Sequence, residues 1–429
     1  MKKPYQLSLH IFRRDLRLDD NTALIEALQS SNRVIPCFIF DKRQIEQNPY
    51  QSDNCIQFMV QSLHELNDEL IKLNSKLYCF YGIAEEVIQQ LTDKLQINAV
   101  FVNRDYTPFS RARDTKIETI CHKKNIDFHV CADALLHEPE EVSRPNHQPY
   151  SIYTHFYNKA SERHAREPNK KIFDNYYREN IQIEDKTILQ KMSGHTNPDL
   201  FIKGGRTEAL SLLKNIKKLQ DYADIRNTPS IQGTTFLSAH NKFGTVSIRE
   251  VYANIVNYFG NKHTLIKELY WRDFFTHIAF HYPRVFDGPF HEKYKHIAWS
   301  KNENHFLAWC NGQTGFPIVD AGMRELNATG YMHNRVRMIV ASFLTKDLHI
   351  DWRMGEKYFA TKLVDYDPAV NNGNWQWAAS TGCDAQPYFR IFNPWLQQKK
   401  FDPDCIYIKR WIPELEIFPA KTLHTLDKA

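Results

Sequence analysis

Two kinds of hydrophobic pattern alternate along the first third of the chain. Short apolar runs, rich in branched residues, predict strands at residues 7–12, 34–40, 77–81, 99–103 and 127–131. Between these runs, apolar residues recur every three or four positions, which predicts helices at residues 20–30, 55–73, 84–95 and 110–124. Strands that alternate with helices are typical of a doubly wound parallel sheet, so we expect a Rossmann-like α/β domain over residues 1–132. No G-x-G-x-x-G motif follows the first strand, which disfavours an ordinary dinucleotide site there.

Both patterns weaken beyond this domain. Five prolines and mixed charges between residues 134 and 206 predict an inter-domain connector, over residues 133–205, that wraps the surface. The rest of the chain, residues 206–429, is predicted to be an all-helical domain. Ser247 and Glu250 have the spacing of a capping box that starts a helix, and Gly260 ends that helix. The next helix is predicted over residues 264–281.

The densest chemical pattern lies between residues 331 and 392. On helical spacing Asn334, Arg337, Met338 and Ala341 share one face. We expect this face to point inward, because Val340 and its apolar neighbours occupy the adjoining positions. Burying a polar group without a partner would cost roughly 2–7 kcal/mol, and burying a charge would cost more. The amide and the guanidinium therefore need partners.

The next segment offers such partners. Asp365 and Asp367 precede a helix that the Asp367-Pro368 pair starts, and Asn371 and Trp375 lie one turn apart in that helix. The pattern leaves two interpretations open. One is a structural ion-pair network in the core, and the other is a pocket for a planar, hydrogen-bonding aromatic ligand beside stacked indoles.

Composition narrows the class of protein. The chain is 42% hydrophobic and 24% charged, which is typical of a globular protein, and 429 residues are enough for two domains. A net charge of +5 permits a phosphate-bearing partner without requiring one. The eight cysteines include no C-x-x-C pair, so we expect no metal and no disulfide framework. Because the N-terminus lacks a long apolar stretch, we expect a soluble, cytoplasmic protein.

Five blocks of sequence carry a family resemblance. They are FRRDLRLDDNTAL, MHNRVRMI, ASFLTKDLHIDWR, DPAVNNGNWQWAAS and PYFRIFNP. In order and spacing they resemble the photolyase/cryptochrome family, and specifically class I cyclobutane pyrimidine dimer photolyases, over nearly the whole chain. The resemblance implies an antenna-type α/β domain, a helical FAD-binding domain, and a monomer that acts on UV-damaged DNA. The implied reaction is blue-light-dependent electron transfer from reduced FAD to a pyrimidine dimer flipped out of the DNA.

The resemblance also implies roles for individual residues. The FAD contacts would be Tyr222, Thr234, Thr235, Leu237, Ser238, Asn334, Arg337, Asp365, Asp367 and Asn371, with Asn371 at the reactive nitrogen of the flavin. The groups that bind the lesion would be Glu268, Trp271, Asn334, Met338 and Trp377. Electrons would reach the flavin through Trp299, Trp352 and Trp375. The DNA phosphates would be held by Arg226, Arg335 and Arg390.

Two segments of the α/β domain carry further predictions. The block that begins at Phe12 is expected to join the sheet to the helical domain, with Arg13, Arg14 and Arg17 paired to nearby aspartates (Asp15 and Asp19). Residues 103–114 fall where the family contacts an antenna pigment. Phe109-Ser110 replaces the Asn-Glu pair of folate-binding relatives, which disfavours a folate. A deazaflavin, a second flavin or no second chromophore remain open.

Three other functions compete with dimer repair. A cryptochrome-type blue-light photoreceptor would share the fold and FAD, but Asn371 and the short segment after PYFRIF favour repair. A (6-4) photoproduct photolyase is expected to have adjacent histidines where this chain has His333-Asn334. A flavin oxidoreductase that acts in the dark would need a nicotinamide fingerprint or an acid–base pair, and neither accompanies the pocket.

Overall fold

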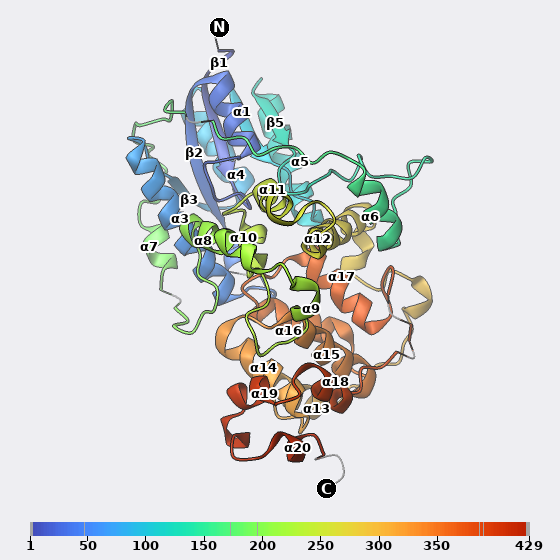
Figure 1. Cartoon of the computed structure of the whole chain (residues 1–429). Helices are drawn as coiled ribbons and strands as arrows, with labels where there is room; N and C mark the ends of the chain where they lie inside the picture. Colours follow the sequence, from blue (N-terminus) through green and yellow to red (C-terminus); the bar gives the residue numbers. More distant parts are fainter. Residues whose placement is uncertain are drawn as a thin grey trace.

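The N-terminal part of the protein is a five-stranded parallel sheet covered by helices (Figure 1). In the computed structural model the described residues are 3–46, 48–171, 173–194, 196–385, 387–388 and 390–425. The strand order is β3-β2-β1-β4-β5. The strands are β1 (Tyr5–Phe12), β2 (Ser31–Asp41), β3 (Tyr78–Gly82), β4 (Ala99–Asn103) and β5 (Asp127–Cys131). The doubly wound parallel sheet expected from the sequence is confirmed.

Helices alternate with these strands as the apolar periodicity predicts. They are α1 (Thr22–Ser30), the short α2 (Lys42–Ile45), α3 (Asp53–Lys72), α4 (Ala84–Lys94) and α5 (Pro108–Lys123). Side-chain caps start four of them: Asn21, Asp41, Ser52 and Thr107 each accept a backbone N–H of the first turn. The strand order reverses direction at β1, and in such sheets ligands bind beyond the carboxyl ends of the strands at that point.

The segment between the two large parts contains more structure than its composition predicts. It includes α6 (Tyr153–Ser161) and α7 (Ile188–Met192), and Tyr176 forms a parallel bridge with Val34 of β2. Helix α6 packs against α12 (Thr264–His281) of the helical part. Prolines on either side of α6 hide its short apolar stripe of Tyr153, Phe156 and Ala160.

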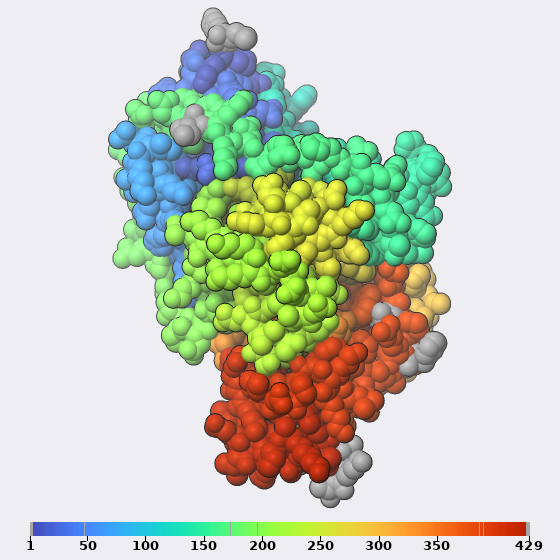
Figure 2. Space-filling view, viewed as in Figure 1, coloured from blue at the N-terminus to red at the C-terminus, as the bar shows by residue number. Residues whose placement is uncertain are grey.

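The rest of the described chain is helical. Its further helices are α8 (Arg206–Asn215), α9 (Tyr222–Ile225), α10 (Ser238–Phe243), α11 (Ile248–Phe259), α13 (Glu303–Asn311), α14 (Pro317–Thr329), α15 (Asn334–Ser342), α16 (Trp352–Lys362), α17 (Pro368–Ala379), α18 (Pro394–Phe401), α19 (Ile406–Trp411) and α20 (Ala420–Leu423). The Ser247–Glu250 capping box is present at α11, and α12 has the predicted bounds. The C-terminal helices form the lower end of the molecule in Figure 2. Within the described residues, no helix is long and apolar enough to cross a membrane.

Helix α17 is the central helix of this part, because α12, α15 and α16 all pack against it. Two glycines permit this close packing. A Cβ on Gly355 of α16 would lie 2.3 Å from the Trp375 ring, and a Cβ on Gly373 of α17 would lie 2.1 Å from the Phe275 ring. Any side chain at either position would push α17 away from its neighbours.

The loop after β1 joins the two parts, but not by the ion pairs expected from the sequence. The prediction that its arginines pair with Asp15 and Asp19 was wrong. Their carboxylate partners are distant in sequence: Arg13 with Asp114, Arg14 with Asp105 and Asp367, and Arg17 with Asp133, while Asp19 pairs with Arg206. Asp15 instead accepts hydrogen bonds from the Arg13 backbone N–H and from the side-chain amides of Asn21 and Asn103, which fixes the loop. Through Arg14 the loop contacts the first turn of α17.

Candidate active site

Helix α15 presents its polar residues to one side and its apolar residues to the core. Val336, Ile339 and Val340 are buried, whereas Asn334 is exposed and Met338 is half-buried. Arg337 is also half-buried and Ala341 is buried, so the expectation that this face points inward was wrong for Asn334. The apolar face packs against α14, so the opposite face remains accessible. Its polar residues are thus placed at a surface that a ligand can reach.

Arg337 is the charged group of this face, and its partner is the one the sequence suggested. Its Nη1 donates to Asp365 Oδ1 at 3.1 Å and its Nη2 donates to Asp365 Oδ2 at 2.9 Å. Its Nε donates to the Met332 carbonyl oxygen at 2.8 Å. This two-point pairing holds the guanidinium in a fixed plane, as the planar fork of arginine allows.

Asn371 contributes an amide from the second turn of α17. Its Nδ2 donates to the Glu356 carboxylate at 3.0 Å and to the Glu356 carbonyl oxygen at 3.2 Å. Glu356 is buried, and burial raises its pKa to about 7. Asp367 caps the same helix with Oδ1, and its other oxygen pairs with Arg14.

Glu268 and Trp271 stand one turn apart on α12. Glu268 is ion-paired with Arg226, a residue that the sequence assigned to DNA phosphates. Desolvation raises the pKa of Glu268, and Arg226 partly offsets this effect. The Trp271 ring is half-buried and stacks face to face on Tyr153 of α6, with centroids 3.6 Å apart and planes 5° apart. Tyr153 was not predicted from the sequence.

A turn rich in hydroxyl groups precedes α10. Thr235 Oγ1 accepts the backbone N–H of Leu237 at 3.3 Å, and Phe236 between them has a left-handed φ of 55°. Leu237 is buried, Thr234 and Thr235 are half-buried, and Ser238 is exposed. Nearby, the buried Oδ1 of Asn241 has no hydrogen-bond partner among the described residues. Tyr222 in α9 is buried under the Arg226 guanidinium, which lies 5.8 Å from its ring centroid.

The three arginines predicted to contact DNA lie near one another. Burial lowers the pKa of Arg335, and the charges of Arg226 and Arg390 lower it further. Arg335 donates to Asn227 Oδ1 at 2.7 Å and stacks 4.5 Å from the centroid of Phe401. Arg390 is exposed. Arginines that lie close together and have few carboxylate neighbours repel one another, and such an arrangement is typical of a surface that binds anions.

The tryptophans assigned to electron transfer differ in burial. Trp352 and Trp375 are 2% exposed, whereas Trp299 is half-buried and lies 5.2 Å from His349. The ring centroid of Trp375 lies 6.1 Å from that of Trp309 and 5.0 Å from that of Phe359. The fully buried Trp309 was missed, because a single tryptophan in a helix gives no signal beyond packing. Trp377, two residues beyond Trp375, is half-buried.

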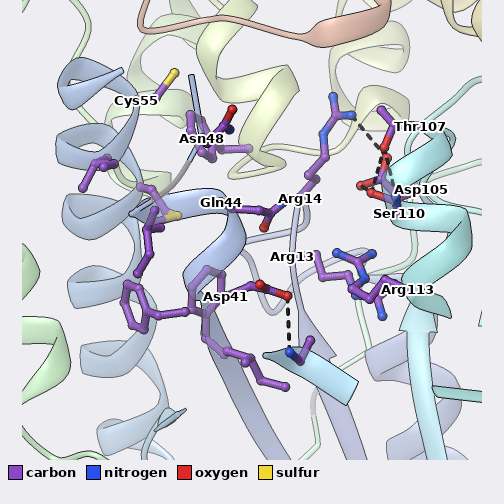
Figure 3. A pocket seen from close by; sticks show the side chains of 18 of the residues that line it. Arg13, Arg14, Asp41, Gln44, Asn48, Cys55, Asp105, Thr107, Ser110 and Arg113 are labelled. Carbon is purple, nitrogen blue, oxygen red and sulfur yellow. Dashed lines mark hydrogen bonds and ion pairs between the residues drawn. The ribbon is translucent and has the colours of Figure 1, made fainter. Parts of the chain in front are cut away.

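A cavity of about 240 Å³ lies between the sheet and the helical part, where the strand order reverses (Figure 3). Arg13, Arg14 and Arg113 approach it from one side, and Asp41 and Gln44 from the other. Asp105, Thr107 and Ser110, within the segment predicted to contact an antenna, also line it. Arg13 and Arg113 are at least nine-tenths buried, and each has an Nη2 without a hydrogen-bond partner among the described residues. These donors fit a ligand that offers acceptor oxygens.

Amide, guanidinium, carboxylate and hydroxyl groups thus gather around α10, α15 and α17. This donor set matches the polar ring edge and the phosphates of a dinucleotide flavin, and the buried Asn241 oxygen remains available to a ligand donor. Within the described residues, no group of three or more His, Cys, Asp or Glu side chains has the geometry of a metal site.

Comparison with known proteins identifies the class to which this fold and site belong. A family model described as DNA photolyase matches residues 8–172, and one described as the FAD binding domain of DNA photolyase matches residues 265–429. The deoxyribodipyrimidine photo-lyase of Alkalihalophilus pseudofirmus is 39% identical over 440 residues, which cover 96% of this chain and 88% of that protein. The chain belongs to the photolyase/cryptochrome family, and FAD is its cofactor.

Two solved structures are similar over almost the whole chain. The archaeal photolyase from Sulfolobus tokodaii, solved with two FAD molecules, is 44% identical with a TM-score of 0.89, over 99% of this chain and 94% of that one. A bacterial class III photolyase from Agrobacterium tumefaciens is 34% identical with a TM-score of 0.92, over 100% of this chain and 90% of that one.

Proposed function

We propose that the protein is a deoxyribodipyrimidine photo-lyase that uses reduced FAD and blue light to split cyclobutane pyrimidine dimers in DNA. The observation that carries the proposal is its similarity, over 96% of the chain, to proteins with this activity. Excited reduced FAD supplies the electron and takes it back, so the protein must position the dimer and stabilise charge. Within the family, the sequence blocks around α15 and α17 favour class I.

Five residues are proposed to bind the flipped-out dimer. Glu268 donates a hydrogen bond to its carbonyl oxygens, which its raised pKa assists because the protonated form is the donor. Trp271 stacks on the bases. Asn334, Met338 and Trp377 line the rest of the pocket, and the accessible face of α15 supports this assignment.

The remaining site residues are proposed to hold the cofactor. Tyr222, Thr234, Thr235, Leu237 and Ser238 surround its phosphates, and the buried, unpartnered oxygen of Asn241 in α10 marks an adjoining acceptor. Arg337 and Asp365 brace the ring system, Asp367 lies at its polar edge, and Asn371 lies at the reactive nitrogen. Trp299, Trp352 and Trp375 are proposed as the photoreduction route.

The DNA backbone is proposed to lie over Arg226, Arg335 and Arg390. Their close approach supports this assignment, because phosphate contacts by a cluster of arginines give salt-dependent, sequence-independent affinity. The protein is proposed to act as a monomer on damaged DNA.

The cavity at the sheet edge is proposed to hold a second chromophore. The similar Sulfolobus tokodaii photolyase contains two FAD molecules, with a light-harvesting role suggested for the additional cofactor. The unpartnered Nη2 atoms of Arg13 and Arg113 would bind ring carbonyls or phosphates of a flavin or deazaflavin. Extraction of the purified protein and chromatography of the released pigments will identify it, and a single FAD per chain would refute a second chromophore.

The proposed function is tested with a thymine-dimer oligonucleotide and the purified, chemically reduced protein. Intact thymines should reappear under blue light and not in the dark. Repair in the dark would instead indicate a thermal flavin enzyme. If light produces no repair while reduced FAD is bound, the (6-4) lesion is the next substrate to assay. A negative result on both lesions would favour a cryptochrome-type photoreceptor.

A further inference from the structure

The connector between the two large parts contributes to the wall beside Trp271. In Figure 1 helix α6 of the connector lies next to α12, and the two helices are in contact. At the first residue of α6, Tyr153 is buried with its ring parallel to the Trp271 indole at 3.6 Å. One face of the indole is therefore covered by protein.

Two hydrogen bonds fix the position of Tyr153. Its hydroxyl donates to the Lys267 carbonyl oxygen at 2.7 Å, one residue before Glu268. Its backbone N–H donates to the Asp384 carboxylate at 3.1 Å, so Asp384 satisfies one of the free N–H groups that begin α6. Asp384 belongs to the loop that follows α17 and has a left-handed φ of 47°.

Tyr153 therefore connects its own helix, α6, with two other segments beside the proposed lesion pocket. It contacts the Glu268–Trp271 turn of α12 through its ring and hydroxyl, and the loop after α17 through its backbone. Phe156, one turn later in α6, packs against Tyr270, Phe274 and His277. Among the rings that contact Trp271 in the described part of the chain, those of Phe274 and Phe275 belong to α12 itself, and Tyr153 supplies the contact from α6.

We propose that Tyr153 is a positioning residue for dimer recognition, which holds the Trp271 indole in the plane onto which a flipped-out pyrimidine pair stacks. This inference rests on the proposed function, because it assumes that Trp271 stacks on the lesion. An indole held on one face loses less conformational freedom when a base stacks on the other face. Tyr153 should therefore affect the preference for damaged DNA and leave phosphate-based binding to undamaged DNA unchanged.

The test compares the affinity of the flavin-loaded protein for a dimer-containing oligonucleotide and for the same oligonucleotide without the dimer. Tyr153→Leu should lower the ratio of the two affinities about tenfold, with an unchanged quantum yield of repair once the dimer is bound. Tyr153→Phe keeps the ring and should restore the ratio to within about twofold. Phe156→Leu is the matched control, because it removes a buried ring from the same helix without touching Trp271.

The outcomes separate the inference from the proposed function. If the wild-type protein does not prefer the dimer, the proposed function fails and the role of Tyr153 fails with it. If Trp271→Ala loses the preference but Tyr153→Leu keeps it, only the present inference is overturned. An equal loss in Phe156→Leu would overturn it too, since general loosening of α6 would then explain the effect. Should Tyr153→Leu not retain FAD, Tyr153→Met serves as an unbranched, more adaptable apolar replacement of similar volume, with the same expected tenfold loss.

Discussion

The Asn371 amide and the Glu356 carboxylate are joined by a hydrogen bond of 3.0 Å from Nδ2 to Oε1. Both hydrogen bonds from the Asn371 side chain to Glu356 use the amide nitrogen, and the amide oxygen is an acceptor that a ligand donor can use. Glu356 is 6% exposed, and burial raises its pKa to about 7, so it is partly protonated at neutral pH. The residue proposed to contact the reactive nitrogen of the flavin thus lies beside a group that readily takes up or releases a proton.

Asn371→Asp should change which redox state of the flavin accumulates under light. The new carboxylate would lie within hydrogen-bond distance of Glu356, and two such carboxyls cannot both ionise easily, so one would retain a proton. Absorption spectra during blue illumination with an external reductant will reveal the change. Asn374→Asp adds the same charge to an exposed position of α17 and should behave as the wild-type protein. A spectrum of Asn371→Asp that matches the wild type would contradict its placement at the ring.

Glu268→Ala should reduce dimer repair by roughly tenfold or more while FAD stays bound. The protonated acid would donate to a dimer that carries the transferred electron, and a hydrogen bond to a charged group contributes about 1.5–3 kcal/mol. The change also leaves Arg226 without its carboxylate partner. Glu268→Gln keeps a hydrogen-bond donor for the dimer and should retain more activity. Repair yield per absorbed photon and FAD content per chain are the two measurements. Equal repair by Glu268→Ala and the wild-type protein would rule out the role of Glu268.

The sequence predicted the fold well because local signals agreed with the final packing. Two strands, residues 99–103 and 127–131, and the helix at residues 264–281 have the bounds that hydrophobic period and caps indicated. The partners of ion pairs that are distant in sequence were not predicted. The arginines after β1 have several aspartates close in sequence, yet their partners lie up to 353 residues away. Nothing in a local pattern encodes such a choice.

The candidate site shows the same limit. Arg337 and Asp365 were predicted as partners because each needs a counter-charge at an enclosed position, and they are paired. Tyr153 was missed because its function depends on which face of α6 meets α12, and proline-rich flanks conceal the helix itself. The exposure of Asn334 was not predicted, because the sequence of α15 alone does not show which side of the helix packs against α14.

Photoreduction should depend on Trp352 and much less on Trp309, although both are buried tryptophans. An oxidised indole is stabilised when it loses its N–H proton to water, and the Trp309 N–H instead donates to the Val340 carbonyl oxygen at 3.0 Å in the core. Trp299 is half-buried and can release a proton. Trp352→Phe should therefore slow light-driven reduction of FAD at least tenfold, as followed by absorbance. Trp309→Phe is the control, and a comparable slowing there would favour a route through Trp309.

Stability should fall as pH rises from about 4.5 to 7, in part because of Glu325. This carboxyl is buried, accepts the Tyr407 hydroxyl at 2.6 Å, and has a pKa raised to about 7 by burial. A raised pKa means that the folded state prefers the protonated acid. The stabilisation from this carboxyl is complete below the pKa that Glu325 has in the unfolded chain. It is lost as pH rises through the pKa that Glu325 has in the folded protein. A shift of this size corresponds to roughly 3 kcal/mol at most. Glu325→Gln should flatten the fall in the thermal unfolding midpoint between pH 5 and 7, and an unchanged slope would argue that Glu325 is ionised throughout.

DNA binding should lose part of its salt dependence when the arginine cluster is reduced. Arg335→Ala and Arg390→Ala should each weaken binding to damaged and undamaged duplexes alike. Each should also lower the slope of log affinity against log salt by about 0.9, the value for one phosphate contact. Arg33→Ala is the matched control, because Arg33 is an exposed arginine of β2 paired with Glu179 and removing it changes the net charge equally. Fluorescence anisotropy at several salt concentrations gives the slopes. If Arg33→Ala lowers the slope as much as Arg335→Ala, net charge and not the cluster controls binding. If none of the three variants changes it, the DNA backbone lies elsewhere on the protein.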